Sequence, residues 1–475
     1  MTATTLSIID AIKDRQLFRP FLQDANGDIS TWHNWMAALR VLYGIGKVPN
    51  KRRQVVEQCT GRQYATLPKR GFDSALFLTG RRSGKSRVAA IIGAFEAAIA
   101  DTHGRLAKGE TGIVAICSPT KLQSRIVKSY LRSVFETPLL KDYVDDETRE
   151  GFTLKNSARV ELLSGDFRTI RGYTLLAAIV DEVAFMGLDE QSHVKSDTEL
   201  IRAIRPALAT TRGKLIAITS PYAKKGWCYS TYKKNFGNDA GRVLVWNSPS
   251  KVMNSTLPQS VIDDAMAEDM ASARAEFGGE FRADISNFID RALVERLVIP
   301  GRWELLPKPG IQYSAFVDMS GGVMDDAVMA VGHAEGRKVI VDRVYRYKPR
   351  FNPHDVIRDM AEQVKHYGVR RVTGDQYAAE FTAQAFASCG IGYIKADLPK
   401  SGLYLELLHK MTANEIELLD DETTVNQISS LERRTRSGGK DSIDHPPGGH
   451  DDLANAIAGC AVVSVKKTIR IGGLI

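Results

Sequence analysis

The sequence lacks the features that would place it outside the cell or in a membrane. Its five cysteines, at positions 59, 117, 228, 389 and 460, are scattered, and no pair has the C-x-x-C spacing of a zinc or redox site. An odd number of scattered cysteines is typical of a reducing cytosol. The first residues lack the basic start and apolar core of a secretory signal, and no run of about 18 apolar residues predicts a membrane span. We therefore expect a cytoplasmic protein without a membrane anchor.

The composition is that of a globular protein with a mild basic excess. Hydrophobic residues make up 43% and charged residues 25% of 475 residues, and the formal net charge is +8. A chain of this length suggests two or three domains. Clusters of lysine and arginine are stronger evidence for nucleic-acid binding than the net charge is. One basic group lies between positions 51 and 70, and a second comprises Arg433, Arg434, Arg436 and Lys440, which we take as candidate DNA contacts.

A glycine-rich turn between a strand pattern and a helix pattern predicts a phosphate-binding loop. Its residues are Thr79, Gly80, Arg81, Arg82, Ser83, Gly84, Lys85 and Ser86. Gly84 would let backbone N–H groups face phosphate oxygens, Lys85 would contact the β- and γ-phosphates, and Ser86 would ligate Mg²⁺. The loop departs from the usual G-x-x-x-x-G-K-[ST] pattern, because Thr79 stands at the first glycine position and Gly80 follows one residue later.

A second motif completes a nucleotide site. The apolar strand pattern at 175–180 ends in Asp181 and Glu182. In a parallel sheet both motifs fall at the carboxyl ends of strands, where ligands bind. Asp181 would hold the Mg²⁺ shell and Glu182 would position or deprotonate the attacking water; the alternative is a strand that ends in solvated acids.

Two further strand ends carry hydroxyl groups, and the loop carries two arginines. Ser118-Pro119-Thr120 and Thr219-Ser220-Pro221 either sense the γ-phosphate or reflect ordinary turn chemistry. One of Arg81 and Arg82 would act as an arginine finger in cis, and the other would pair with a carboxylate. Trp32 and Trp35 fall at helical spacing and are interpreted as core residues.

The last third of the chain predicts a metal site. Strand patterns at 313–318, 327–332 and 338–345 are followed by a helix and a fourth strand at 369–375, which is the order of an RNase H-like domain. Asp318 and Asp375 end the first and fourth strands, which are neighbours in that fold. Two-metal cleavage of a phosphodiester needs carboxylates from separate elements.

The third carboxylate would come from the start of the final helix. Asp451 and Asp452 both precede that helix. We favour Asp452 as the ligand, because Asp451 fits the role of helix N-cap. Asp325 and Asp326 are interpreted as hairpin residues or accessory ligands, and His450 as a structural residue or one that orients a water.

The expected fold class is α/β. The chain would comprise an N-terminal helical or lid segment (1–72), a RecA/P-loop-type ATPase domain with a parallel sheet and helices on both faces (73–285), a linker (286–310) and an RNase H/RuvC-like nuclease domain (311–475). Pro300-Gly301 and the Pro-rich run at 307–310 mark the linker.

The order of the motifs resembles that of the large terminase subunit of tailed bacteriophages. The segments that carry the resemblance are 80–86, 117–120, 171–172, 180–185, 219–222, 316–322, 374–377 and 445–456. The resemblance implies an ATPase that drives double-stranded DNA into a procapsid and a nuclease that cuts concatemeric genomes. It assigns ATPase roles to Lys85, Ser86, Asp181 and Glu182, coupling to Thr219, Ser220 and Pro221, and nuclease roles to Asp318, Asp375 and Asp452.

The resemblance also implies cofactors, partners and a location. ATP with Mg²⁺ would serve the first site, and two Mg²⁺ or Mn²⁺ ions the second. The partners would be a small terminase subunit, a portal protein and further copies of the chain, as a ring during packaging with a monomer in solution as the alternative. The location would be the host cytoplasm and not the mature virion. Asn455 stands where related RuvC-like enzymes often carry a further aspartate, which implies fewer carboxylates here.

Three other functions predict different features of the chain. A two-lobed helicase or translocase with a fused resolvase-like nuclease predicts a second nucleotide-binding lobe after residue 222. A transposase or resolvase with a regulatory ATP site predicts a helix-turn-helix, and none is evident. A pure ATPase with an inert second domain predicts no cleavage of DNA.

Overall fold

The computed structural model describes residues 6–100, 103–164, 168–186, 196–282, 284–320, 322–323, 325–375, 379–435, 441–446 and 449–465. The chain divides into two compact units, 1–283 and 284–475. The division lies near the predicted end of the ATPase domain at residue 285. Among the described residues, no helix is both long and apolar enough to cross a bilayer.

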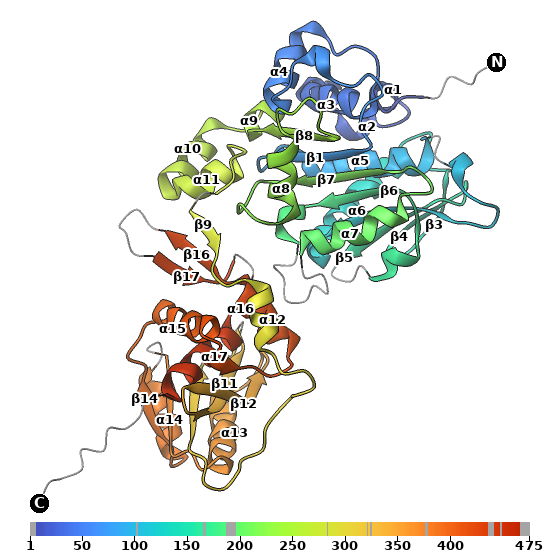
Figure 1. The fold of residues 1–475 in the computed structure, drawn as a ribbon. Helices are drawn as coiled ribbons and strands as arrows, with labels where there is room; N and C mark the ends of the chain where they lie inside the picture. The colour runs from blue at the N-terminus through green and yellow to red at the C-terminus, as the bar shows by residue number, and fades with distance from the viewer. Residues whose placement is uncertain are drawn as a thin grey trace, which may run out of the picture. The chain divides into compact units, whose positions relative to one another are not determined.

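The first unit is built on strands that alternate with helices (Figure 1). Its helices are α1 (Ile8–Lys13), α2 (Arg19–Leu22), α3 (His33–Tyr43), α4 (Asn50–Thr60), α5 (Lys85–Ala98), α6 (Lys121–Phe135), α7 (Asp197–Ala207), α8 (Gly226–Asn235), α9 (Ser250–Met253), α10 (Gln259–Glu268) and α11 (Met270–Glu276). Its strands are β1 (Ser74–Thr79), β2 (Gly112–Ser118), β3 (Val144–Glu147), β4 (Gly151–Leu154), β5 (Arg159–Ser164), β6 (Thr174–Asp181), β7 (Lys214–Thr219) and β8 (Val243–Ser248).

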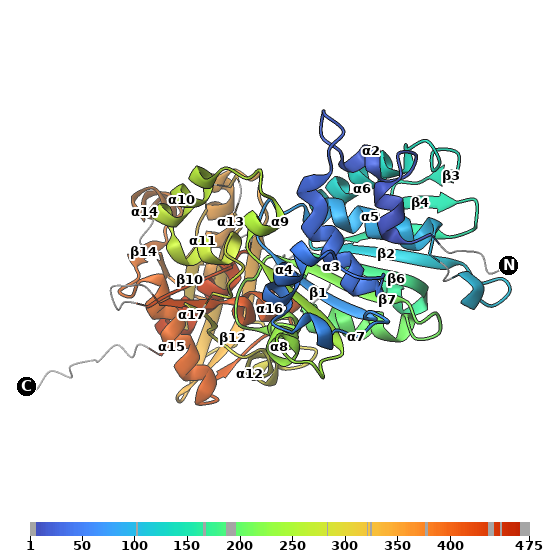
Figure 2. The ribbon, with the colours of Figure 1, turned by 90° about the horizontal axis from the view of Figure 1, so that it is seen from above.

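These strands form one sheet in the order β3-β4-β5-β2-β6-β7-β1-β8. The pairs from β5 to β8 are parallel, and β3, β4 and β5 add antiparallel pairs at one edge. Helices α5 and α6 cover one face and α7 and α8 the other (Figure 2). The central strands are apolar on both faces because both faces are covered. The predicted parallel sheet with helices on both faces is confirmed.

The N-terminal helices pack into the same core as α5. Trp35 is 1% exposed, and its ring lies 5.5 Å from that of Phe77 in β1. Leu39 and Leu42, on the same face of α3, are also buried. The prediction that the helical aromatic spacing marks core is confirmed for Trp35.

The second unit has its own sheets and core (Figure 1). Its helices are α12 (Arg291–Leu297), α13 (Pro353–His366), α14 (Ala379–Ser388), α15 (Lys400–Thr412), α16 (Glu422–Ser430) and α17 (Asp452–Val463). Its strands are β9 (Ile285–Asn287), β10 (Tyr313–Asp318), β11 (Ala327–Glu335), β12 (Lys338–Tyr347), β13 (Arg371–Gly374), β14 (Gly392–Lys395), β15 (Ile416–Glu417), β16 (Glu432–Thr435) and β17 (Asp441–Asp444).

The main sheet of the second unit has the order β14-β13-β10-β11-β12-β15. Strand β10 pairs antiparallel with β11 and parallel with β13, so the first and fourth strands are neighbours, as the sequence predicts. Helix α13 packs on one face, and α15 and α17 pack on the other. Strands β17, β16 and β9 form a separate small sheet. Within the segment predicted as a linker, Val294 and Leu297 of α12 are buried in the core of this unit.

Candidate nucleotide and metal-ion sites

The loop between β1 and α5 is held in a tight turn that depends on its two glycines. Gly84 has a φ of 91°, and a Cβ at this position would lie 2.7 Å from the ring of Trp32. A Cβ on Gly80 would lie 2.2 Å from the Ser250 hydroxyl and 2.8 Å from two backbone carbonyls. Gly80 is therefore required by close packing, even though it stands one residue later than in the common motif.

Three side chains outside the motif bind carbonyl oxygens of the loop. Trp35 Nε1 donates to the Ser83 carbonyl at 2.6 Å, Ser250 Oγ to the Arg81 carbonyl at 2.6 Å, and Asn254 Nδ2 to the Arg82 carbonyl at 2.8 Å. These donors fix the loop backbone from two distant parts of the chain. Ser250 and Asn254 are not predicted from the sequence, because no spacing links them to the loop.

The Lys85 ammonium lies at the centre of the first site. Its Nζ donates to the carbonyls of Thr79 and Gly80 at 3.2 and 3.3 Å and to Ser220 Oγ at 2.8 Å. It also lies 3.5 Å from Glu182 Oε1. The side chain is only 7% exposed, so the cation is pre-positioned by protein oxygens rather than by bulk water.

Ser86 and Asp181 form an oxygen-rich pair beside Lys85. Ser86 Oγ donates to Asp181 Oδ2 at 3.1 Å. The Asp181 side chain is buried, and its Oδ1 has no hydrogen-bond partner among the described residues. Burial, and then the charge of Glu182, raise the pKa of Asp181. A buried carboxylate oxygen without a partner, next to a hydroxyl, fits the ligands that Mg²⁺ prefers.

Glu182 is bonded to the predicted coupling residues. Its Oε2 accepts a hydrogen bond from Thr219 Oγ1 at 3.1 Å and from the Ser220 N–H at 3.2 Å. The backbone of Glu182 is left-handed, with φ 50° and ψ 47°, a conformation that costs energy in a residue with a side chain. Pro221 is buried directly after this pair. The structure therefore brings the predicted base and the predicted coupling segment into contact.

The two loop arginines differ in their partners. Arg81 Nη1 lies 3.2 Å from Glu276 Oε2, whereas Arg82 is exposed and has no ion pair with any described residue. Arg82 is therefore the arginine of the two that is not paired with a carboxylate. Thr120 Oγ1 accepts the Gln123 N–H at 3.2 Å as the N-cap of α6, which favours the turn-chemistry interpretation of that strand end.

In the second unit, the sheet register aligns two of the predicted metal ligands. Val317 of β10 pairs with Gly374 of β13 in parallel register. The next residues along the two strands are Asp318 and Asp375. The Tyr393 hydroxyl donates to the Asp375 carbonyl at 2.9 Å and fixes the end of β13.

Helix α17 brings the third element to the same strand end. A Cβ on Gly459 would lie 2.2 Å from the ring of Phe316, so the helix rests closely on β10. Asn455 Nδ2 donates to Asp318 Oδ2 at 2.8 Å. Asp452 lies one turn before Asn455 on α17.

The carboxylates of this cluster repel one another. Burial raises the pKa of Asp318 to about 7, and the nearby Asp452 adds to the shift. Burial also raises the pKa of Asp452 to about 6, with further contributions from Asp451 and Asp326. Asp452 Oδ2 has no hydrogen-bond partner among the described residues. Buried, mutually repelling carboxylate oxygens from separate elements fit divalent cations.

Asp451 is bonded differently from Asp452. Lys400 Nζ lies 2.8 Å from its carboxylate, and the Tyr404 hydroxyl donates to Oδ2 at 2.7 Å. Asp451, Asp444 and His445 form a group with metal-ligand spacing, but Lys400 Nζ also lies 3.4 Å from Asp444 and supplies a cation. These bonds favour Asp452 over Asp451 as the ligand.

The N-cap interpretation of Asp451 is wrong for its side chain. Asp451 occupies the N-cap position of α17, but its side chain makes no capping bond. The free N–H groups of Leu453 and Ala454 instead donate to Gln427 Oε1, at 2.8 and 3.2 Å. Its carboxylate instead pairs with Lys400 and accepts a hydrogen bond from the Tyr404 hydroxyl.

The remaining acidic and histidine candidates lie at the edge of the cluster. His450 Nδ1 lies 3.5 Å from Asp325 Oδ1 and 3.9 Å from Asp452 Oδ2. Asp326 is buried and paired with Arg346. An exposed Asp325 and a paired Asp326 agree with hairpin roles more than with metal ligation.

Several of the described basic residues are engaged within the protein. The Arg433 guanidinium lies 5.6 Å from the Phe288 ring, and Arg434 Nη2 donates to the His445 carbonyl at 2.7 Å. Arg436 and Lys440 lie outside the described residues. In the N-terminal group Arg62 is 3% exposed, and its guanidinium donates to the backbone carbonyls of Asn235 and Val243, so this side chain is engaged within the first unit.

Comparisons with known proteins give low sequence identities and low TM-scores. No protein-family model matches the chain, and no curated protein matches it. Among solved structures, the chain is similar to the large terminase of bacteriophage HK97, at 15% identity and a TM-score of 0.38 over 90% of this chain and 99% of that one.

Two further solved structures have similar sequence identities and TM-scores to this chain. The large terminase of a thermophilic bacteriophage is 16% identical, with a TM-score of 0.39 over 87% of this chain and 98% of that one. The large terminase nuclease of another thermophilic phage, G20c, is 16% identical, with a TM-score of 0.33 over 36% of this chain and 96% of that one. At these values the likenesses carry no functional argument, and the function is argued from the side chains described above.

Proposed function

We propose that the chain is the large terminase subunit of a tailed bacteriophage. ATP hydrolysis in the first unit would drive double-stranded DNA into a procapsid, and a divalent-metal endonuclease in the second unit would cut the concatemeric genome. One observation carries the proposal: in each unit a central strand ends in an aspartate that is buried or half-buried and lies beside further polar or charged side chains. Asp181 with Ser86 and Lys85 forms the first cluster, and Asp318 with Asp452 forms the second.

The first cluster supports an ATPase. Bound ATP with Mg²⁺ supplies an electrophilic γ-phosphorus whose negative oxygens are partly neutralised by the metal. Lys85 would hold the β- and γ-phosphates, and Ser86 and Asp181 would hold the magnesium ion. Glu182 accepts a proton from the attacking water, and its bonds to Thr219 and Ser220 keep its carboxylate oriented.

ATP hydrolysis would be coupled to movement of the protein through the same hydrogen bonds. Thr219 and Ser220 end β7 beside Glu182, so a shift of the Glu182 carboxylate on hydrolysis changes both hydrogen bonds. Pro221 follows at once and transmits the shift to the segment that leads into α8. The coupling role of the segment 219–221 is supported by this contact.

The second cluster supports phosphodiester cleavage. Asp318 and Asp375 would hold divalent ions from adjacent strands and Asp452 from α17. Such ions would supply Lewis-acid activation of water and would offset charge on the leaving oxygen. Asn455 keeps Asp318 oriented through its 2.8 Å hydrogen bond. No base-reading element is evident in the sequence, so cleavage has little sequence preference.

The helicase alternative receives no support. It predicts a second nucleotide-binding lobe of parallel strands after residue 222, whereas the main sheet of the second unit mixes antiparallel β10–β12 with parallel β13 and β14. The partners that the motif resemblance implies, a small terminase subunit, a portal and a ring of copies, belong to this proposal, as does the host cytoplasm.

Two matched variants of the full-length chain test the proposal. The wild type should cleave supercoiled plasmid in Mn²⁺ and hydrolyse ATP. Asp375→Ala should lose about 100-fold or more of cleavage and keep its ATPase, because the clusters lie in separate units. Lys85→Ala should show the reverse. Plasmid cleavage by Asp375→Ala at the wild-type rate would refute the nuclease assignment, and ATP turnover by Lys85→Ala would refute the ATPase assignment.

A further inference from the structure

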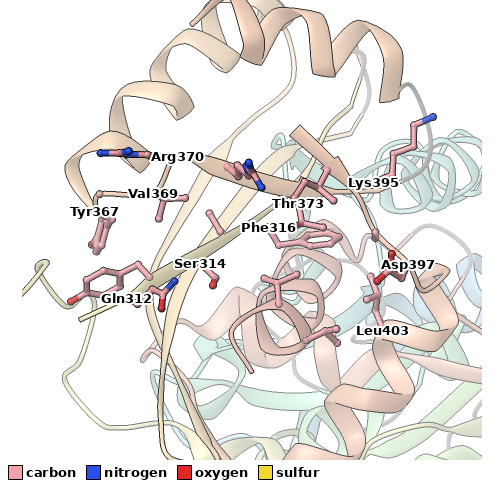
Figure 3. Close-up of a pocket in the computed structure, with 18 of the residues that line it drawn as sticks. Gln312, Ser314, Phe316, Tyr367, Val369, Arg370, Thr373, Lys395, Asp397 and Leu403 are labelled. Carbon is pink, nitrogen blue, oxygen red and sulfur yellow. The ribbon is translucent and has the colours of Figure 1, made fainter. Parts of the chain in front are cut away.

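The second unit contains a groove that neither cluster uses. It has a volume of about 930 Å³ and lies on the face of the main sheet that α15 and α17 partly cover (Figure 3). Its apolar lining includes Phe316, Ile394, Leu403, Val462 and Val463. On β10 it is lined by residues 313–316, whereas Asp318 ends that strand. We call this cavity the β14 groove.

The rim of the β14 groove is cationic. Arg370, Arg371 and Lys395 line it and are exposed, and Figure 3 shows Arg370 and Lys395 at its two sides. None of the three forms an ion pair with a described residue. Asp397 is the one acidic side chain among the described lining residues. Three exposed cations beside one carboxylate attract negative charge.

One side of the groove is a strand with a free edge. In the described part of the chain, β14 pairs with β13 alone and stands at the end of the six-stranded order. Its outer N–H and C=O groups are therefore open to another strand. Ile394, in the middle of β14, is 46% exposed, which is unusual for an isoleucine in a sheet.

We propose that the β14 groove docks an extended acidic segment of a partner protein. The segment adds to β14 as a further strand, and its backbone pairs with the free edge. Alternate apolar side chains of the segment enter the groove over Phe316, Ile394 and Leu403. Acidic side chains between them meet Arg370 and Lys395, whereas Arg371 lies on the same face as Ile394, so that both periodicity and charge select the partner.

Other occupants meet fewer of these features. The last ten residues of the chain begin shortly after Val463, but they carry Lys466, Lys467 and Arg470 and no acidic side chain, so the rim repels them. Duplex DNA would satisfy the cations and leave the apolar lining uncovered. A small anion would use neither the lining nor the strand edge. Only an acidic segment with alternating apolar residues satisfies all three features.

The test is direct binding, measured on the full chain without nucleotide or metal, and it is independent of the proposed function. The probe is a fluorescein-labelled ten-residue peptide in which glutamate and aspartate alternate with valine and isoleucine. Fluorescence anisotropy should give a Kd below about 100 μM in dilute salt. Arg370→Glu with Lys395→Glu should weaken binding about tenfold or more. Ile394→Ser should weaken it about fivefold.

Matched controls separate the features of the groove. Lys365→Glu with Lys410→Glu makes the same charge change outside the groove lining and should leave Kd within about twofold. Circular dichroism and thermal unfolding check that each variant is folded. A peptide with N-methylated backbone amides should lose affinity, because it cannot donate to β14. A peptide with lysine at the acidic positions should also lose affinity.

Four results would overturn the proposal. The first is a Kd above about 1 mM for the acidic peptide. The second is equal binding by the rim variant and its control, or by the N-methylated peptide. The third is about tenfold tighter binding by a chain that ends at Val465, which would make the C-terminal residues the occupant. The fourth is displacement of the peptide by a 20-base-pair duplex through the same rim residues, which would make DNA the occupant.

Discussion

Asn455 donates a 2.8 Å hydrogen bond to Asp318 across 137 residues of sequence. The bond joins α17 to the end of β10, and it stabilises the ionised form of a carboxylate whose pKa burial raises to about 7. The amide of Asn455 supplies a hydrogen-bond donor to Asp318. An aspartate at this position would instead add a further negative charge. The geometry of the proposed metal cluster therefore depends on a residue that is not itself a metal ligand in the proposal.

Replacing this donor by a carboxylate should make stability depend on metal. Asn455→Asp places a negative charge beside Asp318 and removes the hydrogen bond, which should cost about 2 kcal/mol or more without divalent ions. Added Mn²⁺ should raise the Tm of the variant more than that of the wild type, because the cation offsets the new charge. Thermal unfolding with and without Mn²⁺ measures the effect. Asn414→Asp, at an exposed turn, is the control, and equal Mn²⁺ responses in all three proteins would contradict the idea.

The raised pKa values predict how the metal-free protein responds to pH. The folded pKa of Asp318, about 7, lies above its ordinary value of 3.8, so the folded state binds the proton more tightly than the unfolded state does. Its contribution to stability is fully present below about pH 4 and is lost as the pH rises through 7. We expect a loss on the order of 2–4 kcal/mol, reduced by the partial exposure of the residue.

Asp318→Asn isolates this effect. Urea unfolding between pH 5 and 8, in the presence of a chelator, should show a smaller decrease in stability for the variant than for the wild type. Other titrating groups are common to both proteins and cancel in the difference. A wild-type curve parallel to that of Asp318→Asn would show that the carboxyl group is not perturbed.

The contacts of Glu182 predict separate effects on binding and hydrolysis. Glu182→Gln keeps the shape of the side chain and removes the base, so ATP binding should persist while turnover falls about 100-fold or more. Thr219→Val removes one of the two hydrogen bonds that orient Glu182 and should lower turnover by about tenfold. Nucleotide binding by fluorescence and phosphate release separate the two quantities. Normal turnover by Glu182→Gln would exclude it as the base.

Lys400 and Asp451 should behave as one unit. Lys400→Met leaves a buried carboxylate without its cation and should cost about 3 kcal/mol or more. Asp451→Asn in the same background removes the stranded charge and should recover most of that loss. A double-mutant cycle by denaturant unfolding measures the coupling, and the ATPase of the other unit is the internal control. Additive losses would mean that the 2.8 Å contact contributes nothing.

Trp35 should affect ATP binding although it lies in the N-terminal helices. Trp35→Phe keeps most of the packing against Phe77 and removes the donor to the Ser83 carbonyl. The loss of one buried hydrogen bond, about 1 kcal/mol, should weaken ATP binding about fivefold through a looser loop. Trp246→Phe, at a buried tryptophan bonded to Met253 rather than to the loop, is the matched control. Equal ATP affinities would assign Trp35 to packing alone.

Strand ends and local motifs account for what the sequence predicts well. Lys85 and Ser86 follow directly from the turn between a strand and a helix. The adjacency of Asp318 and Asp375 follows from the order of strands, because parallel neighbours end at the same edge of a sheet. These features need only local pattern and topology.

Tertiary contacts account for the rest. The donors Ser250 and Asn254 reach the loop from more than 160 residues away in the sequence, and nothing in their spacing signals the contact. Asp451 and Asp452 are identical in type and adjacent, and only the positions of Lys400 and Tyr404 distinguish them. Gln427 replaces a local N-cap with a side chain from another helix, a substitution that no local rule predicts.

Packing at Gly459 limits the geometry of the proposed metal cluster from a distance. Any larger side chain would meet the Phe316 ring at 2.2 Å, and α17 would have to retreat from β10. Asp452 and Asn455 would move with the helix, and the distance between the Asp452 and Asp318 carboxylates would increase. A position that would touch neither ion nor substrate thus acts as a spacer for the proposed metal cluster, through the absence of a single methyl group.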